Sequence, residues 1–302
     1  MVIMPPYSSP VHVVFALDKP FLGYSAIAAA SAAAATTHLH IHVLHAGDLG
    51  QGADNLARLM EHHGARAAFH KVDPTKLSDL PVSGHVSLAT YYRLCIADLL
   101  PTQVSKVIYL DGDLIVRKSL AELYAFDAAQ TGIAAVPEPH ESANERLGIP
   151  TEADYFNAGV LVIDLDFWRQ NDLTARLYKI AAQEKTRLRF WDQDLLAIYL
   201  QGNFTRLPSH WNVHHRYFFG DNRLPWPSIE PAIVHFSGSG LKPPDYKVLH
   251  PYASEFWSYA RQVSAFGFKL QDATSLKLWA RRFRFWRTHR AKMTRSDQKH
   301  AA

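Results

Sequence analysis

Two carboxylates flank one glycine at Asp111-Gly112-Asp113, where one apolar run ends and the next begins. Three interpretations fit this arrangement. The glycine, which accepts a positive φ, could form a hairpin turn. The first aspartate could be the nucleophile of a phosphatase. Both carboxylates could instead hold one divalent cation against a diphosphate, because hard oxygen ligands suit Mn²⁺ and Mg²⁺.

The surrounding sequence weakens the phosphatase interpretation. In haloacid-dehalogenase-like phosphatases the nucleophile usually follows the first strand, and a later lysine and a late acidic pair complete the site. Here 110 residues precede Asp111, three predicted strands come before the one that ends next to it, and no suitable acidic pair follows it. The hairpin and the metal clamp both remain open at this point.

The elements that position these residues follow a strand–helix alternation. β-Branched or alternating apolar runs predict strands at residues 11–17, 38–45, 65–72, 106–110, 132–136, 159–165 and 232–236. Helical patterns cover the Ala-rich segment ending at residue 35 and residues 53–63, 87–99, 172–184 and 192–200. This order predicts an α/β fold with a mostly parallel sheet flanked by helices. Ligands of such sheets bind beyond the carboxyl ends of the strands, where Asp18, Asp111 and His235 are expected.

Composition restricts the class of protein. The 302 residues are 48% hydrophobic, which is enough for a substantial core, and Cys95 is the only cysteine. A single cysteine cannot form an internal disulfide and suits a reducing compartment. Residues 1–10 lack the basic and apolar regions of a signal peptide, and the Ala-rich segment at 26–35 is too short to span a bilayer. We therefore expect a cytoplasmic protein.

Positive charge is concentrated at the end of the chain. Residues 269–302 hold ten Lys and Arg against two Asp, whereas residues 1–268 hold 22 basic and 26 acidic residues. We expect a catalytic domain at 1–268 and a basic, aromatic, helical tail at 269–302. Trp and Phe among Lys and Arg favour peripheral binding to an anionic membrane surface, here the inner face of the plasma membrane. A disordered tail and a helix packed on the body remain alternatives. A nucleic-acid partner is not expected, because the body offers no second basic surface.

Four motifs in order carry a family resemblance. "YLDGDLIV", "YFNAGVLVIDL", "WDQDLL" and "HFSGSGLKP" resemble family 8 of the retaining glycosyltransferases, in particular the bacterial lipopolysaccharide α-galactosyl- and α-glucosyltransferases and, more distantly, glycogenin. The resemblance covers roughly residues 11–242. It implies a GT-A fold, a UDP-hexose donor (UDP-galactose or UDP-glucose), a glycan or lipid-linked glycan acceptor such as lipopolysaccharide core, and Mn²⁺, with Mg²⁺ as an alternative ion.

The resemblance also implies roles for individual residues. The metal ligands would be Asp111, Asp113 and His235. The catalytic residues would be Gln193 and Asp192. The residues around the donor would be Ala16, Asp18, Arg93, Asp111, Gly112, Asn157, Ala158, Gly159, Asp192, Gln193, Gly238 and Lys242.

Several of these residues have a purely structural alternative. Asp192 and Gln193 could belong to a helix N-cap box, and Arg93 could be a solvent-facing helix residue. His235 could be an ordinary strand-end histidine. Lys242 comes one residue later than in the family pattern.

The mechanism and the acceptor contacts are less constrained. Gln193 is an amide and a poor nucleophile, so we expect front-face, internal-return substitution, with Asp192 as nucleophile only if it can reach the anomeric carbon. His85, Thr90 and Glu138 fall where the family places acceptor contacts, and solvent-facing roles remain equally open. The functional alternatives are a UDP-sugar hydrolase, a phosphatase or a non-catalytic nucleotide-sugar-binding protein.

The tract "HLHIHVLH" places His38, His40 and His42 on one face of a predicted strand. We interpret it as a polar strand face rather than a zinc site, because zinc sites usually combine ligands from more than one element.

Overall fold

The computed structural model describes residues 10–82, 87–219, 230–237 and 250–270, together with Ala280 and Phe283. Its main sheet has seven strands in the order β3-β2-β1-β4-β7-β6-β8, and a smaller sheet has the order β5-β10-β9. The strands of the main sheet are β1 (Val11–Leu17), β2 (Leu39–His45), β3 (Arg66–Lys71), β4 (Lys106–Leu110), β6 (Ile133–Pro137), β7 (Phe156–Asp164) and β8 (Thr205–Arg206). Those of the small sheet are β5 (Leu114–Val116), β9 (Val213–His214) and β10 (Ile233–His235).

The helices connect these strands. The α-helices are α1 (Leu22–Ala35), α2 (Gln51–His62), α3 (Ile96–Leu99), α4 (Ala121–Tyr124), α5 (Glu141–Leu147), α6 (Leu165–Gln170), α7 (Leu173–Glu184), α8 (Trp191–Leu200), α9 (His215–Phe219) and α10 (Ala253–Ser264). The 3₁₀ helices are η1 (Lys19–Phe21), η2 (Pro74–Leu77), η3 (Leu88–Cys95) and η4 (Ser209–Trp211). None of the helices in the described ranges has the length and hydropathy needed to cross a membrane.

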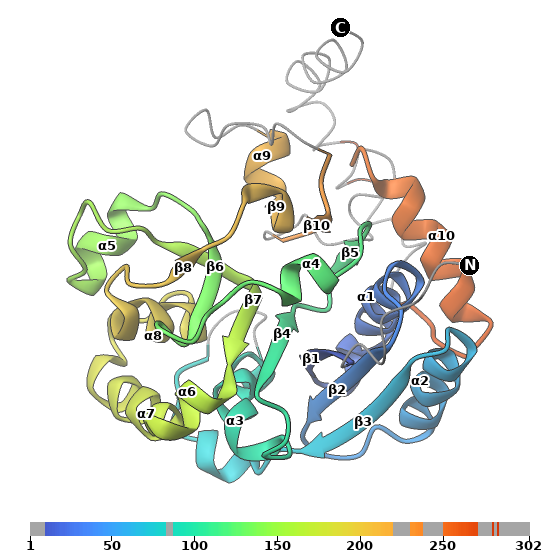
Figure 1. Ribbon diagram of the computed structural model, residues 1–302, viewed down its shortest axis with the longest axis horizontal. Helices are drawn as coiled ribbons and strands as arrows, with labels where there is room; N and C mark the ends of the chain where they lie inside the picture. The colour runs from blue at the N-terminus through green and yellow to red at the C-terminus, as the bar shows by residue number, and fades with distance from the viewer. Residues whose placement is uncertain are drawn as a thin grey trace, which may run out of the picture.

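The main sheet separates two hydrophobic cores. One face packs against α1, with α2 and α10 beside it, and the other packs against η3, α3 and α6–α8. Figure 1 shows α1, α2 and α10 gathered beside the β1–β3 side of the sheet, and α5–α8 beside β6 and β8. Because both faces are covered, strands such as β1 are apolar along nearly their whole length.

Helix α1 lies close to both sheets because its buried face is made of small residues. Ala26, Ala28, Ala29, Ala30 and Ala32 are fully buried. Within this helix Ser31 Oγ donates to the Ala28 carbonyl at 2.7 Å and accepts from the Val116 amide at 2.9 Å. The hydroxyl therefore links α1 to β5, the strand that directly follows the two candidate metal-binding aspartates.

The predicted α/β fold is confirmed, with three differences in detail. The sheet is mostly parallel, but β7 runs antiparallel to β4 and β6. Strand β10, which carries His235, pairs with β5 and β9 in the small sheet. Residues 88–95 form a 3₁₀ helix rather than an α-helix. Local periodicity predicts that an element exists, but neither its strand partners nor its direction.

The hairpin interpretation of Asp111-Gly112-Asp113 is wrong. Strand β4 pairs with β1 and β7, whereas β5 pairs with β10, so the two strands around this stretch belong to different sheets. The stretch carries the chain from one sheet to the other at the carboxyl end of β4.

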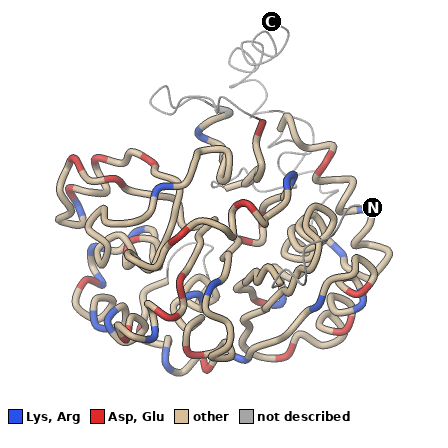
Figure 2. Tube along the Cα trace, viewed as in Figure 1, with Lys and Arg blue, Asp and Glu red and all other residues tan. Residues whose placement is uncertain are grey.

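Charged residues of both signs are spread over the described part of the molecule. Figure 2 shows Lys and Arg interspersed with Asp and Glu along the tube, without a broad face of one sign in this view. Residues 268–270 pack against the body: Phe268 is buried, Leu270 contacts the core on the α1 side, and the Lys269 carbonyl lies close to Gly23. The basic tail beyond them lies outside the described residues apart from Ala280 and Phe283, so the domain boundary and the helical, membrane-binding tail stay predictions.

Candidate active site

Asp111, Asp113 and His235, hereafter the metal trio, meet where the two sheets adjoin. One ligand atom from each residue lies within 4.8 Å of the other two. His235 Nε2 is 3.2 Å from Asp113 Oδ1 and 3.6 Å from Asp111 Oδ2. Asp113 and His235 are buried, while the Asp111 carboxylate is 28% exposed and so gives the trio access to solvent.

A chain of amides fixes the orientation of His235. Its Nδ1 lies 3.0 Å from Asn212 Oδ1, and because an amide oxygen only accepts, Nδ1 carries the proton. In the neutral imidazole, which is the form that binds a metal, the lone pair of Nε2 faces the two carboxylates. The Asn212 amide group donates at 3.0 Å to Asn157 Oδ1, which also accepts from the Gly159 amide at 3.0 Å.

Gly159 provides the space in which the metal trio meets. A Cβ at this position would lie 2.2 Å from His235 Cε1 and 2.9 Å from Asp111 Oδ2. Gly112 is constrained in a similar way, since a Cβ there would lie 2.3 Å from Ser25 Oγ and 3.0 Å from the Phe21 ring. Gly112 is not among the residues with positive φ, so close packing against α1 and η1, rather than turn geometry, requires the glycine.

Arg93 joins three parts of the site from the interior. It is 6% exposed, which rules out a solvent-facing helix residue. Its Nη2 donates to Asp111 Oδ1 at 2.9 Å and its Nη1 to the Ala158 carbonyl at 2.7 Å. Its Nε lies 2.8 Å from Asp192 Oδ2, and its guanidinium lies 4.0 Å from the centre of the Tyr109 ring. Burial lowers the pKa of Arg93, but the charge of Asp192 and further groups outweigh it, so the pKa is raised overall.

Asp192 is held on both sides. It is 3% exposed, and Oδ1 accepts a hydrogen bond from Thr90 Oγ1 while Oδ2 pairs with Arg93. Burial raises the pKa of Asp192 to about 6, against the opposing effect of Arg93. Burial outweighs the ion pair for Asp192 because its carboxylate is enclosed, while Arg93 remains charged at every accessible pH. The N-cap box is wrong for Asp192, since the N-cap of α8 is Phe190.

Gln193 is fixed at both ends of its amide. Its Oε1 accepts from the Ala158 amide at 2.9 Å and its Nε2 donates to Tyr155 Oη at 3.0 Å. Tyr155 Oη in turn donates at 2.7 Å to Asp194 Oδ1. Burial raises the pKa of Tyr155 well above its ordinary value, so its hydroxyl keeps the proton that it donates.

Asp194 anchors the first turn of α8. It is fully buried, and Arg146 binds it with two donors, at 2.8 and 3.1 Å. Its Oδ2 also accepts from the amides of Arg189 and Phe190. A negative charge in the first turn of a helix is favoured by the helix dipole. Asp194 thereby holds the segment that carries Asp192 and Gln193.

The remaining predicted residues fall in different places. Ala16 lies near the end of β1, and Asp18 follows it and caps η1 by accepting from the Phe21 amide at 3.2 Å. Glu138 is buried and paired with Arg216 and with His214, whose Nε2 is 3.4 Å away. Gly238, Lys242 and His85 lie outside the described residues.

The metal trio fits a hard divalent cation. Two carboxylates and one imidazole nitrogen converge, the nitrogen lone pair faces inward, and the absence of a side chain at Gly159 keeps the shared space open. Three protein ligands leave positions in an octahedral shell for oxygens of a substrate.

Sequence reasoning missed the residues that support this site. Asn212 and Tyr109 orient the ligands, the latter by donating at 3.0 Å to Asp111 Oδ1. Asp194 and Arg146 hold α8. No local pattern marks Asn212 or Arg146, because each acts through a contact with a residue far away in the chain. Asp194 stands inside the "WDQDLL" motif and is the one that sequence could have indicated.

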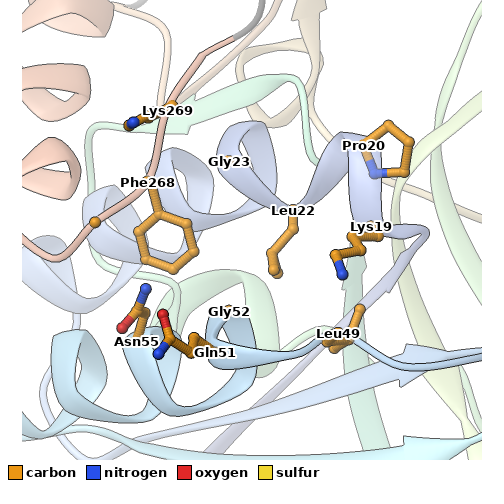
Figure 3. A pocket seen from close by; sticks show the side chains of 11 residues that line it. Lys19, Pro20, Leu22, Gly23, Leu49, Gln51, Gly52, Asn55, Phe268 and Lys269 are labelled. Carbon is orange, nitrogen blue, oxygen red and sulfur yellow. The ribbon is translucent and has the colours of Figure 1, made fainter.

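A separate hollow of about 360 Å³ lies between the start of α1, the start of α2 and the segment after α10. Figure 3 shows the Gln51 and Asn55 amides and the Phe268 ring on one side of it, and Lys19 on the other. None of the residues predicted from the sequence to bind donor or metal lines it, although Lys19 directly follows Asp18. It therefore does not belong to the metal trio.

Comparison with known proteins gives a family match and several relatives. The model of glycosyl transferase family 8 matches residues 12–247. General stress protein A of Bacillus subtilis is 30% identical over 236 residues, which cover 72% of this chain and 81% of that protein. Lipopolysaccharide 1,3-galactosyltransferase of Salmonella typhimurium is 25% identical over 240 residues, covering 75% and 71%.

Solved structures of LgtC resemble the whole described fold. The crystal structure of the galactosyltransferase LgtC with donor and acceptor sugar analogues superposes with a TM-score of 0.77 at 26% identity, covering 90% of this chain and all of that one. An active-site mutant of LgtC, in which glutamate replaces a glutamine, superposes equally well at 27% identity over 83% of this chain and 96% of its own. The fold of the present chain is accordingly a GT-A fold.

Proposed function

Because the chain belongs to glycosyl transferase family 8, we propose that it transfers a hexose from UDP-galactose or UDP-glucose to a glycan acceptor of the lipopolysaccharide-core type, with Mn²⁺ and with retention of configuration. The observation that carries the proposal is the metal trio and its connections to the start of α8. Arg93 pairs with both Asp111 and Asp192, and the Ala158 amide, next to Gly159 in β7, donates to Gln193. The curated lipopolysaccharide glycosyltransferases among the relatives support the acceptor class.

Each part of the site has a role in this proposal. A bound Mn²⁺ supplies neutralising charge to the diphosphate as the leaving group develops. Asp111, Asp113 and His235 would hold it, and the positively charged Arg93 fixes Asp111 from the interior. Ala16 and Asp18 bind the uridine, together with Gly112, while Asn157, Ala158 and Gly159 face the sugar. Gly238 and Lys242, outside the described residues, are proposed to contact the diphosphate.

The character of the two residues at the start of α8 supports the proposed retention. Gln193 is an amide clamped by Ala158 and Tyr155, which suits a group that faces the anomeric centre without forming a bond to it. Asp192 is buried and already paired with Arg93 and Thr90, so we assign it to sugar hydroxyls and to the positioning of Arg93 rather than to attack. Front-face substitution then needs no enzyme nucleophile. The LgtC mutant supports an active-site role for a glutamine in a related protein.

Donor screening with a metal control tests the proposal. UDP release from UDP-galactose and UDP-glucose is measured with Mn²⁺, after EDTA, and after Mn²⁺ is restored. We expect EDTA to abolish release. Asp113→Asn should lower it on the order of a hundredfold while the fold survives, because it removes an inward-facing ligand. The matched control, Asp166→Asn, changes a half-exposed carboxylate and should leave the rate unchanged.

The product and the dependence on acceptor separate the alternatives. An α-linked product in the anomeric proton coupling of the NMR spectrum supports retention, and a β-linked product contradicts it. Release of UDP that does not rise with any glycan acceptor would indicate a UDP-sugar hydrolase. Full activity after rigorous chelation would exclude the metal role of the trio, and no release from either donor would reject the proposed donors.

We further propose that the basic tail binds an anionic membrane surface. Residues 275–295 hold eight Lys and Arg with no acidic residue, interspersed with Trp and Phe. Each basic residue near such a surface contributes about 1 kcal/mol. Full-length protein should co-sediment with anionic liposomes, less so at high salt, whereas a chain ending at Asp272 should stay in the supernatant and still release UDP. Equal sedimentation of the two forms contradicts the role of the tail.

A further inference from the structure

Four histidines from three adjacent strands share one face of the main sheet. His12 stands on β1, His40 and His42 on β2, and His70 on β3. His12 pairs in register with His40, and His42 pairs with Ala68, two residues before His70, so all four side chains fall on the same side. We call these residues the histidine cluster. The sequence argued against zinc because its three histidines came from a single strand. In the structure β1 and β3 contribute His12 and His70 to the cluster.

The cluster is separate from the metal trio. His12 and His40 are the second residues of their parallel strands, whereas Asp18 and Asp111 follow the carboxyl ends of β1 and β4. Six residues of extended chain from His12 to Asp18 span roughly 20 Å. The histidine cluster therefore lies toward the opposite end of the sheet from the proposed donor site.

The cluster has the geometry of a metal site. One ligand nitrogen each from His12, His40 and His42 lies within 4.8 Å of the others. His12 Nδ1 and His42 Nε2 are 2.9 Å apart. Two nitrogens on one tetrahedral Zn²⁺ stand about 3.3 Å apart, given Zn–N bonds of about 2.0–2.1 Å, so a slight opening admits the ion in place of the shared proton. His12 and His40 are partly exposed, which leaves a route of entry.

The fourth histidine orients the third. Burial lowers the pKa of His70, and a hydrogen bond to the Leu99 backbone opposes this, as expected when the imidazole is the donor. Because Nε2 of His70 faces His42, we assign the donated proton to Nδ1 and the accepting lone pair to Nε2. His42 Nδ1 therefore donates to His70 Nε2 at 3.0 Å, which leaves the Nε2 lone pair of His42 directed toward His12. A ligand imidazole whose other nitrogen donates to a fixed acceptor is the usual outer support of a metal site.

We propose that His12, His40 and His42 form a second, nitrogen-rich metal site that takes a borderline transition-metal ion such as Zn²⁺, with His70 as the positioning residue for His42. Imidazole ligands suit Zn²⁺, whereas the carboxylates of the metal trio suit Mn²⁺ or Mg²⁺. A solvent molecule completes the four ligands of a tetrahedral ion.

The charge state of the cluster supports this proposal. Burial, followed by the neighbouring imidazoles His40, His12 and His70, lowers the pKa of His42 to about 3. Burial likewise lowers the pKa of His12, His40 and His70. The imidazoles are thus neutral at physiological pH, which is the form that binds a metal. Arg66, opposite His40 in register, opposes a cation, but it is exposed and therefore screened by solvent.

Zinc binding to the full-length protein tests the site. Equilibrium dialysis with Zn²⁺ in excess Mg²⁺, which competes for the carboxylate-rich trio, counts the Zn²⁺ ions bound per chain. We expect one fewer Zn²⁺ in His42→Gln and in His12→Ala than in the unchanged protein. His70→Ala should retain the site with affinity lowered about 10–100-fold. The control His38→Asn changes an exposed histidine with positive φ next to β2, which Asn tolerates, and should bind as the unchanged protein does.

Co²⁺ gives an independent readout. A tetrahedral, nitrogen-liganded Co²⁺ absorbs visible light much more strongly than an octahedral, oxygen-rich one, so the strong bands should vanish in His42→Gln and persist in His38→Asn. Circular dichroism verifies the fold of each variant, and His12→Ala covers the case in which the buried His42 change unfolds the protein. Equal Zn²⁺ counts in the unchanged protein and folded His12→Ala would overturn the proposal, as would an equal loss in His38→Asn.

Discussion

Replacing Gly159 by alanine perturbs the metal trio without removing a ligand. The new Cβ would lie 2.2 Å from His235 Cε1, 2.7 Å from His235 Nδ1 and 2.9 Å from Asp111 Oδ2. Carbon atoms in ordinary contact are about 3.5–4.0 Å apart, so the imidazole must retreat by more than about 1 Å. It is 2% exposed, and β10 is held between β5 and β9, so this retreat cannot occur without displacing neighbours.

The expected cost can be worked out from this displacement. Misplacing a functional group by about 1 Å lowers catalysis by about 10²-fold, which corresponds to about 2.7 kcal/mol. Disturbing the support of a metal ligand lowers metal affinity about 10–100-fold. We therefore expect Gly159→Ala to lower kcat/KM about a hundredfold and to weaken Mn²⁺ binding by at least tenfold, with an overpacking cost of about 1–3 kcal/mol in stability.

Two measurements separate metal binding from general damage. The signal of free Mn²⁺ in electron paramagnetic resonance reports binding directly, and UDP release across a Mn²⁺ titration reports catalysis. Val162→Ala is the matched control, since it removes buried atoms from the same strand, β7, within the core. It should lower stability by about 0.5–3 kcal/mol and leave Mn²⁺ affinity unchanged. Unchanged Mn²⁺ affinity and turnover in a folded Gly159→Ala protein would refute the assignment of this space to the ion.

Three further outcomes follow from the supporting contacts. Asn212→Ala removes the acceptor of His235 Nδ1 and should weaken Mn²⁺ binding about 10–100-fold in the same titration, and unchanged binding would contradict the orienting role. Asp194→Asn breaks a buried ion pair and should lower the free energy of unfolding in urea by about 3–5 kcal/mol. The control Asp154→Asn breaks an exposed pair and should lower it by about 0–1 kcal/mol, and equal losses in the two variants would contradict the anchoring role of Asp194. Burial raises the pKa of Asp192 to about 6, so the carboxylate gains a proton as the pH falls through 6 and kcat/KM should fall there. Asp192→Asn should lower the plateau of the pH profile and remove this fall in acid. If the fall persists in Asp192→Asn, it comes from another group.

The strands and the ligand types could be predicted from sequence because they depend on local patterns. Each of the seven predicted strands corresponds to an observed one, since a run such as Val11–Leu17 is covered on both faces and is therefore apolar at nearly every position, His12 excepted. Asp111 and Asp113 stood out because paired carboxylates are ligands that suit a divalent cation, and the family resemblance added His235 to them. The order of four motifs indicated the family, and the family model confirms it.

Tertiary structure decided what each of these residues touches. Sequence could not tell that Arg93 is buried between Asp111 and Asp192, because the three come from separate elements. A turn at Gly112 was one of the interpretations that the sequence left open, whereas close packing against Ser25 is what requires the glycine.

The histidines illustrate the physical reason most directly. Alternation within β2 identified one strand face, but the hydrogen bonds of His42 reach His12, 30 residues earlier, and His70, 28 residues later. Periodicity fixes which way a side chain points relative to its own strand. Strand order and register, which depend on how the whole chain packs, fix which side chains it meets.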